Sequence, residues 1–278
     1  MTQMLFICSR NTLFELLGDE KYMGAKPGII TSLHTWTKTL LTHPHIHCLV
    51  TGGGLTPTGE WALAKKDFLL PYGVIKDVFR RYVRKAVLKA LAQGDLELPD
   101  DMGPQQLKNI MNKLGRKKWN VRICEKYPHG NGVLTYLARY LRGGPIANSR
   151  IVNIKDDKVT FNYGRKKREL MTLSISEFIG RFLNHIPLPN AILVRSYGLY
   201  ASATKDDLEK CRAILGQEPV EEPQKIEWQD CFKDSKNHPE RCPVCGKRLV
   251  TTTVFKSIGM IPHSGAPPLL MPYLKKAV

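Results

Sequence analysis

The spacing of apolar positions changes several times along the chain, and each change predicts a new secondary-structure element. Between residues 72 and 93 apolar residues recur every three or four positions, which indicates a long amphipathic helix. Residues 28–36 and 45–50 are β-branched and apolar and are bounded by Pro or Gly, which predicts strands. The remaining patterns predict helices at 10–19, 104–116, 131–142, 175–185 and 204–215, strands at 119–126 and 191–197, and a hairpin at 150–163 turning at Asp156-Asp157.

This mixture predicts an α+β fold, with helices packed on an antiparallel sheet and a small C-terminal tail, rather than a doubly wound parallel sheet. The chain has 278 residues, 42% of them hydrophobic, which is enough to bury a sizeable core. Residues 216–240 carry seven acidic residues, three lysines and three prolines, whereas residues 241–278 carry six basic residues and no acidic one. We therefore predict a main domain at 1–215, an acidic linker at 216–240 and a basic tail at 241–278.

The overall charge points to an anionic partner. Lys plus Arg number 42 and Asp plus Glu number 25, a net charge of +17. The basic residues are spread over many segments instead of one amphipathic helix, which favours nucleic acid over a lipid surface. No apolar run approaches the roughly 18–20 residues of a membrane span. No secretory signal is evident, and the seven cysteines form no disulfide framework, so we expect a cytoplasmic protein without a membrane partner.

Three histidines are the first candidate site. Side chains alternate between the faces of a strand, so His45 and His47 point the same way, about 7 Å apart, and Ile46 points to the opposite face. If the preceding strand pairs with this one, His34 can supply a third imidazole. Three such nitrogens can bind one divalent ion and leave positions open for phosphate oxygens and water. The alternative is a set of surface histidines on an edge strand.

Two tyrosines on the predicted helix 131–142 are the second candidate site. Tyr136 and Tyr140 are four residues apart and therefore share one helix face. A phenol, with an ordinary pKa near ~10, is a poor nucleophile unless a metal and nearby cations assist it. Packing in the core is the alternative role for such a pair. The same helix carries flanking arginines and an apolar stripe that we expect to face the sheet: Arg139 and Arg142, and Leu134, Leu137 and Leu141.

Several motifs together resemble one known family. They are His-Pro-His-Ile-His-Cys-Leu-Val at 43–50, Gly-Gly-Gly at 52–54, Tyr-Leu-Ala-Arg-Tyr at 136–140 and Ile-Ala-Asn-Ser-Arg-Ile at 146–151. In this order they resemble the two-tyrosine HUH transposases of rolling-circle insertion sequences, and the likeness runs from about residue 15 to about residue 250. Family members carry a cysteine-rich zinc ribbon and a first sheet strand upstream of this region. We therefore expect this chain to be truncated at its N-terminus, with an unpaired edge left in its sheet.

The resemblance implies a mechanism. His45 and His47 match the metal-binding pair for Mg²⁺ or Mn²⁺, and Tyr136 and Tyr140 match the nucleophiles. His34 as third ligand follows from analogy with related relaxases. The implied substrate is single-stranded DNA at the transposon ends and at the target. The implied product is a 5′-phosphotyrosine link with a free 3′-OH, and the implied location is the nucleoid of a bacterial cytoplasm.

Further residues carry weaker predictions. We expect Arg116, Lys117 and Lys118, together with Arg139 and Arg142, to contact DNA phosphates, and Trp119 or Tyr163 to be available for base stacking. Cys-Pro-Val-Cys at 242–245 is typical of a zinc knuckle, which needs four ligands. The candidate zinc ligands are Cys231, His238, Cys242 and Cys245.

The sequence favours a DNA strand transferase but leaves two alternatives open. One is an inactive, truncated DNA-binding remnant of such an enzyme, and the other is a metal-dependent hydrolase of another kind that uses the histidines alone. The sequence does not identify protein partners.

Overall fold

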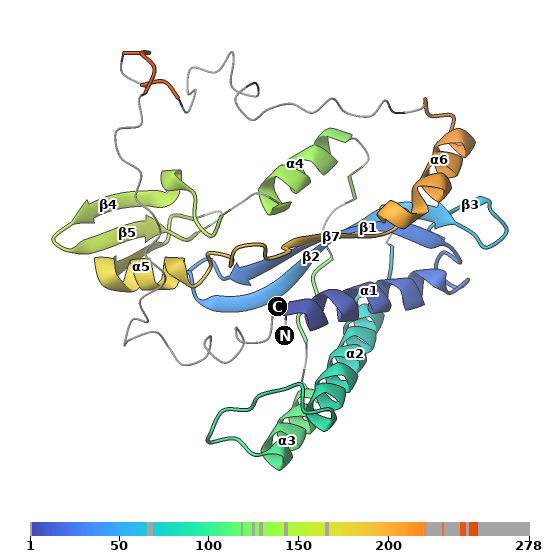
Figure 1. Cartoon of the computed structure of the whole chain (residues 1–278), viewed down its shortest axis with the longest axis horizontal. Coiled ribbons are helices and arrows are strands. Elements are labelled where there is room, and N and C mark those ends of the chain that lie inside the picture. Colours follow the sequence, from blue (N-terminus) through green and yellow to red (C-terminus); the bar gives the residue numbers. More distant parts are fainter. Residues whose placement is uncertain are drawn as a thin grey trace. The chain divides into compact units, whose positions relative to one another are not determined.

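The structure, a computed structural model, describes residues 2–65, 69–117, 119–123, 126–127, 130–141, 144–164, 167–218, 220, 230, 240–242 and 245–249. The chain divides into two units, residues 1–217 and 218–278. The described part of the first unit is α+β, as predicted, with six α-helices and two antiparallel sheets of four and three strands (Figure 1).

The larger sheet carries the candidate histidines and has helices on both faces. Its strand order is β3-β2-β1-β7, and every neighbouring pair is antiparallel. The strands are β1 (Lys26–Trp36), β2 (Thr42–Leu55), β3 (Trp61–Leu63) and β7 (Val194–Gly198). Within the described residues, β2 is paired on its outer side only at Gly53–Leu55, so its stretch beside the histidines forms an edge of the sheet.

The two faces of this sheet carry different helices. Helices α1 (Thr2–Gly18) and α2 (Tyr72–Ala92) cover one face, where Leu17 and Ile29 are fully buried in a core that also contacts Val78. Helix α4 (Gly130–Leu141) lies on the other side (Figure 1). Alternation along β1 explains the division, because Ile29 and Leu33 face the α1 side while Ser32 and His34 face α4.

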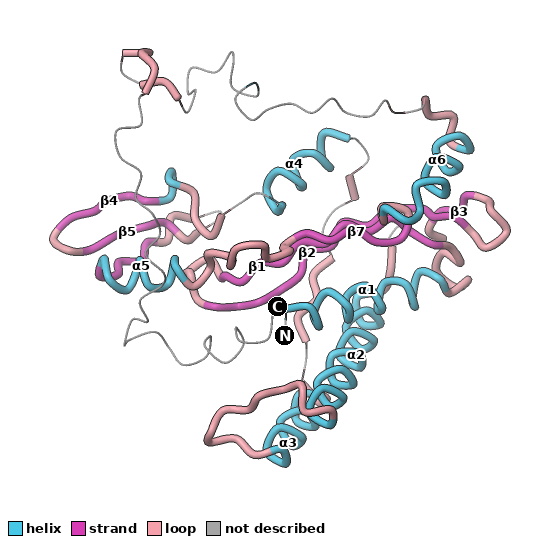
Figure 2. Tube along the Cα trace, in the orientation of Figure 1, coloured by secondary structure: helices cyan, strands magenta, loops and turns pink. Residues whose placement is uncertain are grey.

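The smaller sheet has three strands and is followed by a helix. It consists of β4 (Ile151–Lys155), β5 (Lys158–Asn162) and β6 (Leu170–Ser174), followed by α5 (Ile175–Leu183), as Figure 2 shows. The predicted hairpin turn is confirmed: Asp156 and Asp157 both have positive φ, 51° and 56°, as a two-residue type I′ turn requires. Ser174 caps α5 by accepting a hydrogen bond from the Glu177 amide.

One predicted strand is wrong. The described residues of segment 119–126 form no strand and follow α3 (Pro104–Leu114) as irregular chain. The Trp119 ring packs edge-on against Phe79, and its indole N–H donates to the carbonyl of Leu114 at the end of α3, which also accepts from the Lys117 amide. Trp119 therefore packs at the end of a helix and not in a sheet.

The other differences concern boundaries. α1 begins at Thr2, before the predicted start at residue 10, and α6 (Lys205–Ile214) agrees closely with its prediction. β3 and β6 were not predicted. None of the described helices has both the length and the apolar character that crossing a bilayer needs.

A glycine at the end of β7 gives a testable prediction about stability. Gly198 has a φ of +63°, and a Cβ there would lie 1.8 Å from the carbonyl oxygen of Pro27. Gly216 has a similar φ of +64° but open space around it. We expect Gly216→Ala to lower the free energy of unfolding by about 1 kcal/mol, the cost of a positive φ alone. Gly198→Ala should lower it by more than about 3 kcal/mol, since the backbone must also move. Urea unfolding of both variants checks this, and equal losses would contradict the close approach.

Candidate active site

Three imidazoles meet on the α4 side of the larger sheet. β1 and β2 pair so that His34 lies opposite His45, and Ser32 lies opposite His47. The ring centroid of His34 is 4.4 Å from that of His47 and 5.6 Å from that of His45. One ring nitrogen from each histidine lies within 4.8 Å of the others. The strand register therefore brings together residues that are eleven or more positions apart.

Backbone carbonyls orient two of these rings. Nε2 of His34 donates to the Tyr140 carbonyl at 2.8 Å, and Nδ1 of His45 donates to the His43 carbonyl at 2.7 Å. A carbonyl oxygen only accepts, so the opposite nitrogen of each neutral ring carries the lone pair. Metal-binding histidines in proteins are usually held in this way, with the remote N–H on a carbonyl or carboxylate.

Burial favours the neutral form of the central histidine. His34 is 6% exposed, and desolvation is the largest effect that lowers its pKa below the ordinary value. The Tyr140 carbonyl raises the pKa and the neighbouring His45 lowers it, with a net decrease. His34 therefore stays neutral to a lower pH than an exposed histidine, and a neutral imidazole is the form that binds metals.

The donor set fits a divalent ion. Three imidazole nitrogens within reach of one another, two of them with fixed tautomers, form a ligand group that leaves further positions open. Among the described residues no carboxylate joins this group. Imidazole nitrogens are typical ligands of transition-metal ions, whereas Mg²⁺ prefers oxygen ligands.

Both candidate tyrosines lie against the histidines. The Tyr140 ring is 4.2 Å from the His47 ring and 5.8 Å from the His34 ring, measured between centroids. Tyr136 lies 4.5 Å from Tyr140 and 6.5 Å from His47, and it is 9% exposed. One helix face thus presents two phenols to the imidazole group.

The C-terminal end of α4 is fastened to β1. The Tyr140 carbonyl accepts two hydrogen bonds, one from Ser32 Oγ at 2.7 Å and one from His34 Nε2. This carbonyl belongs to the last turn of the helix, where no helical amide is available to it. The same bond therefore orients a candidate metal ligand and places the backbone of a candidate nucleophile.

The apolar stripe of α4 was predicted wrongly. Leu134 is 64% exposed, and Leu137 and Leu141 are only half-buried. The tyrosine face is the one that turns to the sheet, because its rings stack against the histidines and against each other.

Sequence reasoning missed three aromatic or polar residues around the site. Trp36 stacks on His34 with ring centroids 4.3 Å apart, and Tyr127 lies 5.8 Å from Tyr136. His185 is buried and bridges Thr35 Oγ1 and the Leu40 carbonyl, which fastens the β1–β2 connection. Trp36 is two residues after His34 on the same strand, so alternation could have predicted that both side chains lie on one face. No local sequence pattern pointed to Tyr127 or His185.

Of the predicted DNA-binding residues, Arg116 and Lys117 are the two whose side chains the structure describes, and they lie away from the histidines. Arg116 and Lys117 follow α3, which lies beside the part of α2 that is away from the sheet (Figure 1). Arg139 belongs to α4, but its side chain lies outside the described part, as do Lys118 and Arg142.

The predicted zinc knuckle is described only in part. Cys242 and Cys245 are among the described residues, the Gly246 amide donates to the Cys242 carbonyl, and Gly246 has a φ of +70°. Cys231 and His238 lie outside the described residues. The zinc site stays a prediction.

Comparison with known proteins identifies the family. Residues 28–207 match the family Y2_Tnp, described as "Putative transposase". The chain is 31% identical over 270 residues, 92% of its length, to "Putative transposase y4qJ" of Sinorhizobium fredii. It is 26% identical over 264 residues, 89% of its length, to the "Transposase for insertion sequence element IS801" of Pseudomonas savastanoi pv. phaseolicola.

The alignments span 68% of the first relative and 63% of the second. No solved structure matches the chain. The family match covers most of the chain, including both strands of the histidine group and the whole of α4, and the chain therefore belongs to the Y2_Tnp family of transposases.

Proposed function

We propose that this protein is a metal-dependent, tyrosine-type HUH endonuclease that cleaves and transfers single-stranded DNA in rolling-circle transposition. The observation that carries the proposal is the contact of Tyr140 and Tyr136 with the imidazole group: the Tyr140 ring is 4.2 Å from His47 and 4.5 Å from Tyr136. Two potential nucleophiles beside one metal-ligand group suit two successive attacks on DNA phosphates.

His34, His45 and His47 hold the divalent ion in this proposal, with Mn²⁺ or Mg²⁺ as the candidates. When bound, the ion acts as a Lewis acid that polarises the scissile phosphate and offsets its developing charge. The chain's own part is to fix the imidazoles through the Tyr140 and His43 carbonyls and to hold the phenols beside them.

The covalent step balances without an external energy source. The phenol oxygen of one tyrosine attacks phosphorus and loses its proton, the bond from phosphorus to the 3′ oxygen breaks, and the 3′ oxygen leaves as a hydroxyl. The product is a 5′-phosphotyrosine, whose phosphodiester keeps the transfer potential. The second tyrosine performs a later attack that resolves or inserts the strand. The DNA partners are the element's ends and a target, in the bacterial cytoplasm at the nucleoid.

Covalent capture of DNA tests this function. Single-stranded oligonucleotides tiled across the DNA on both sides of the gene are labelled at the 3′ end, because the 3′ fragment is the one that stays on the protein. We expect an SDS-resistant labelled adduct with Mn²⁺ or Mg²⁺ and none after chelation. The double variant Tyr136→Phe/Tyr140→Phe should form no adduct, whereas Tyr127→Phe, a neighbouring ring outside the proposed pair, should form it.

The contrary outcomes separate the alternatives. An adduct that persists in the double variant refutes the assignment of the tyrosines. Cleavage without an adduct, dependent on the histidines alone, indicates a metal-dependent hydrolase. Salt-sensitive DNA binding with neither cleavage nor adduct under any metal indicates an inactive DNA-binding remnant.

A further inference from the structure

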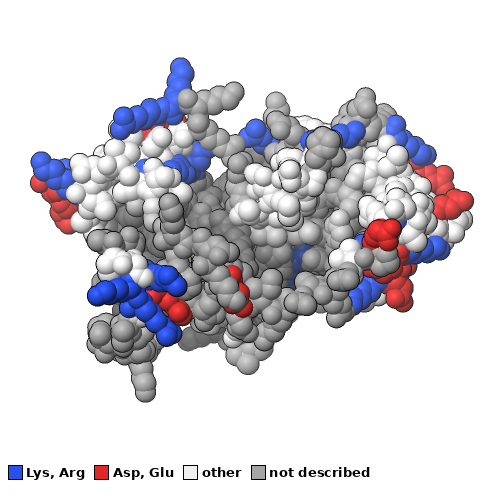
Figure 3. Space-filling model, turned by 90° about the horizontal axis from the view of Figure 1, so that it is seen from above, with Lys and Arg blue, Asp and Glu red and all other residues white. Residues whose placement is uncertain are grey.

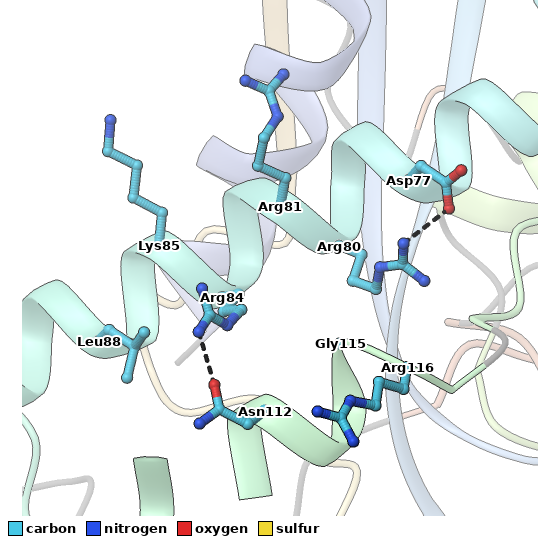
Figure 4. Close-up of a pocket in the computed structure, with 9 residues that line it drawn as sticks. All are labelled: Asp77, Arg80, Arg81, Arg84, Lys85, Leu88, Asn112, Gly115 and Arg116. Carbon is cyan, nitrogen blue, oxygen red and sulfur yellow. Dashed lines mark hydrogen bonds and ion pairs between the residues drawn. The ribbon is translucent and has the colours of Figure 1, made fainter. Parts of the chain in front are cut away.

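A basic cleft lies between α2 and α3, away from the histidines. It has a volume of about 860 Å³ and is lined mainly by polar and basic side chains (Figure 4). The lining residues are Asp77, Arg80, Arg81, Arg84, Lys85, Leu88, Asn112, Gly115 and Arg116. Five of these nine are basic and one is acidic, so the cleft is strongly positive.

Helical spacing gathers these charges. Arg80 and Arg84 are four residues apart on α2 and point across the gap toward Asn112 and Arg116 (Figure 4). Lys85 lies on the adjacent side of α2 and extends away from the gap, which widens the positive surface. Segments about thirty residues apart in the sequence thus contribute cations to one space.

Part of this charge has no internal counterion. Arg80 pairs with Asp77 at 3.1 Å, and Arg81 pairs with Glu15 on α1. In the described part of the chain, no carboxylate pairs with Arg84, Lys85 or Arg116, all of which are exposed. Three cations near one cleft repel one another, so an anionic ligand stabilises them.

The cleft has a fixed framework. Arg84 donates to the Asn112 side chain at 2.7 Å, and the Trp119 ring on Phe79 ties the chain after α3 to α2. This contact fixes the position of the Arg84 guanidinium and leaves its other N–H groups available for a ligand. A planar guanidinium can donate two parallel hydrogen bonds to phosphate oxygens.

The lining chemistry favours one kind of nucleic acid. Proteins that bind single strands usually combine cations with aromatic side chains on which bases stack. No aromatic side chain lines this cleft, whereas Trp36, Tyr136 and Tyr140 surround the histidines. Basic side chains without aromatic neighbours can contact phosphates but cannot stack on unpaired bases. They therefore favour a duplex, whose bases are already paired.

The cleft and the histidines also lie on opposite sides of the larger sheet. α2 packs through Val74, Ile75 and Val78 into the core that contains Ile29, while His34 faces α4. On the face seen in Figure 3, the described Lys and Arg side chains stand in separate groups and not in one broad patch. The cleft is thus a positive surface that is separate from the histidine group.

We propose that the α2–α3 cleft binds the phosphate backbone of double-stranded DNA. Resting on the proposed function, it would hold a duplex segment of the substrate while the opposite side of the sheet acts on a single strand. Recognition through phosphates makes this contact independent of base sequence and sensitive to salt.

Fluorescence anisotropy with a labelled 20-base-pair duplex of arbitrary sequence tests the proposal. The variant Arg84→Gln/Lys85→Gln/Arg116→Gln should bind the duplex at least about tenfold more weakly at moderate salt. The slope of log affinity against log salt should fall by about 2–3, since each lost phosphate contact removes about 0.9. Affinity for a single-stranded oligonucleotide should change much less.

A matched variant separates the cleft from overall charge. Lys155→Gln/Lys158→Gln/Arg168→Gln removes the same three charges from exposed positions in or near the smaller sheet. We expect it to bind duplex like the unmodified protein, and thermal unfolding checks that both variants are folded. Equal losses in the two variants, or an unchanged duplex affinity in the cleft variant, overturn the proposal. An equal loss of single-strand affinity overturns the assignment to duplex.

The adduct assay distinguishes this inference from the proposed function. If the cleft does not bind duplex DNA but the proposed function is right, the cleft variant forms the adduct and binds duplex DNA normally. If the function is wrong but the cleft is right, no protein forms the adduct while the cleft variant alone loses duplex binding.

Discussion

Tyr140→Phe is expected to abolish the first covalent cleavage of single-stranded DNA, whereas Tyr136→Phe is expected to leave that step largely intact. The Tyr140 ring lies 4.2 Å from the His47 ring, against 6.5 Å for Tyr136, and Tyr136 is 9% exposed. The phenol closer to the imidazoles is the one positioned to attack first. Loss of the attacking oxygen should lower the rate of adduct formation by about 10³-fold or more.

The measurement is the rate of adduct formation with a 3′-labelled oligonucleotide, followed by identification of the modified peptide by mass spectrometry. Phe keeps the ring and its stacking, and urea unfolding checks that both variants are folded. Tyr136→Phe should still fail in the later transfer, seen as an adduct that does not pass its strand to a second oligonucleotide. An adduct mapped to Tyr136 in the unmodified protein would reverse the proposed order.

The double variant His45→Ala/His47→Ala is expected to lose metal binding and, with it, cleavage. Two of the three proposed ligands are removed, and a single imidazole binds a divalent ion only weakly. Isothermal titration with Mn²⁺ should show binding to the unmodified protein and none at the site in the variant. Adduct formation should fall by about 10³-fold or more, because the polarising charge on the phosphate is lost.

His43→Ala is the matched control for this variant. His43 is exposed on the same strand, and its backbone carbonyl, which alanine also provides, accepts the hydrogen bond from His45. The substitution removes the contact between the two rings, whose centroids are 5.6 Å apart, but keeps this hydrogen bond. We therefore expect His43→Ala to keep Mn²⁺ binding and adduct formation. Equal damage in the control, or Mn²⁺ binding that survives in the double variant, contradicts the assignment of the metal ligands. Duplex DNA binding should be the same in all these proteins, because the basic cleft is on the other side of the sheet.

The strand and helix patterns predicted most of the larger sheet correctly because they are local. Period-two alternation placed His45 and His47 on one face, and four-residue spacing placed Tyr136 and Tyr140 together. Asp156 and Asp157 marked their turn because these residues tolerate positive φ. The strand prediction for segment 119–126 was wrong because Trp119 packs against Phe79 of α2 and bonds to the end of α3, and such packing partners are not visible in a short window of sequence.

By itself the sequence determined the residue types and the local spacing: three imidazoles, two phenols and an excess of positive charge. Only the tertiary structure decided that His34 lies opposite His45, that the tyrosine face of α4 and not its leucine face turns to the sheet, and that Arg84 and Arg116 share one cleft. The physical reason is that each of these contacts joins elements distant in sequence. Their geometry follows from strand register, helix packing and the hydrogen bonds to the Tyr140 carbonyl, all of which form only when the whole domain folds.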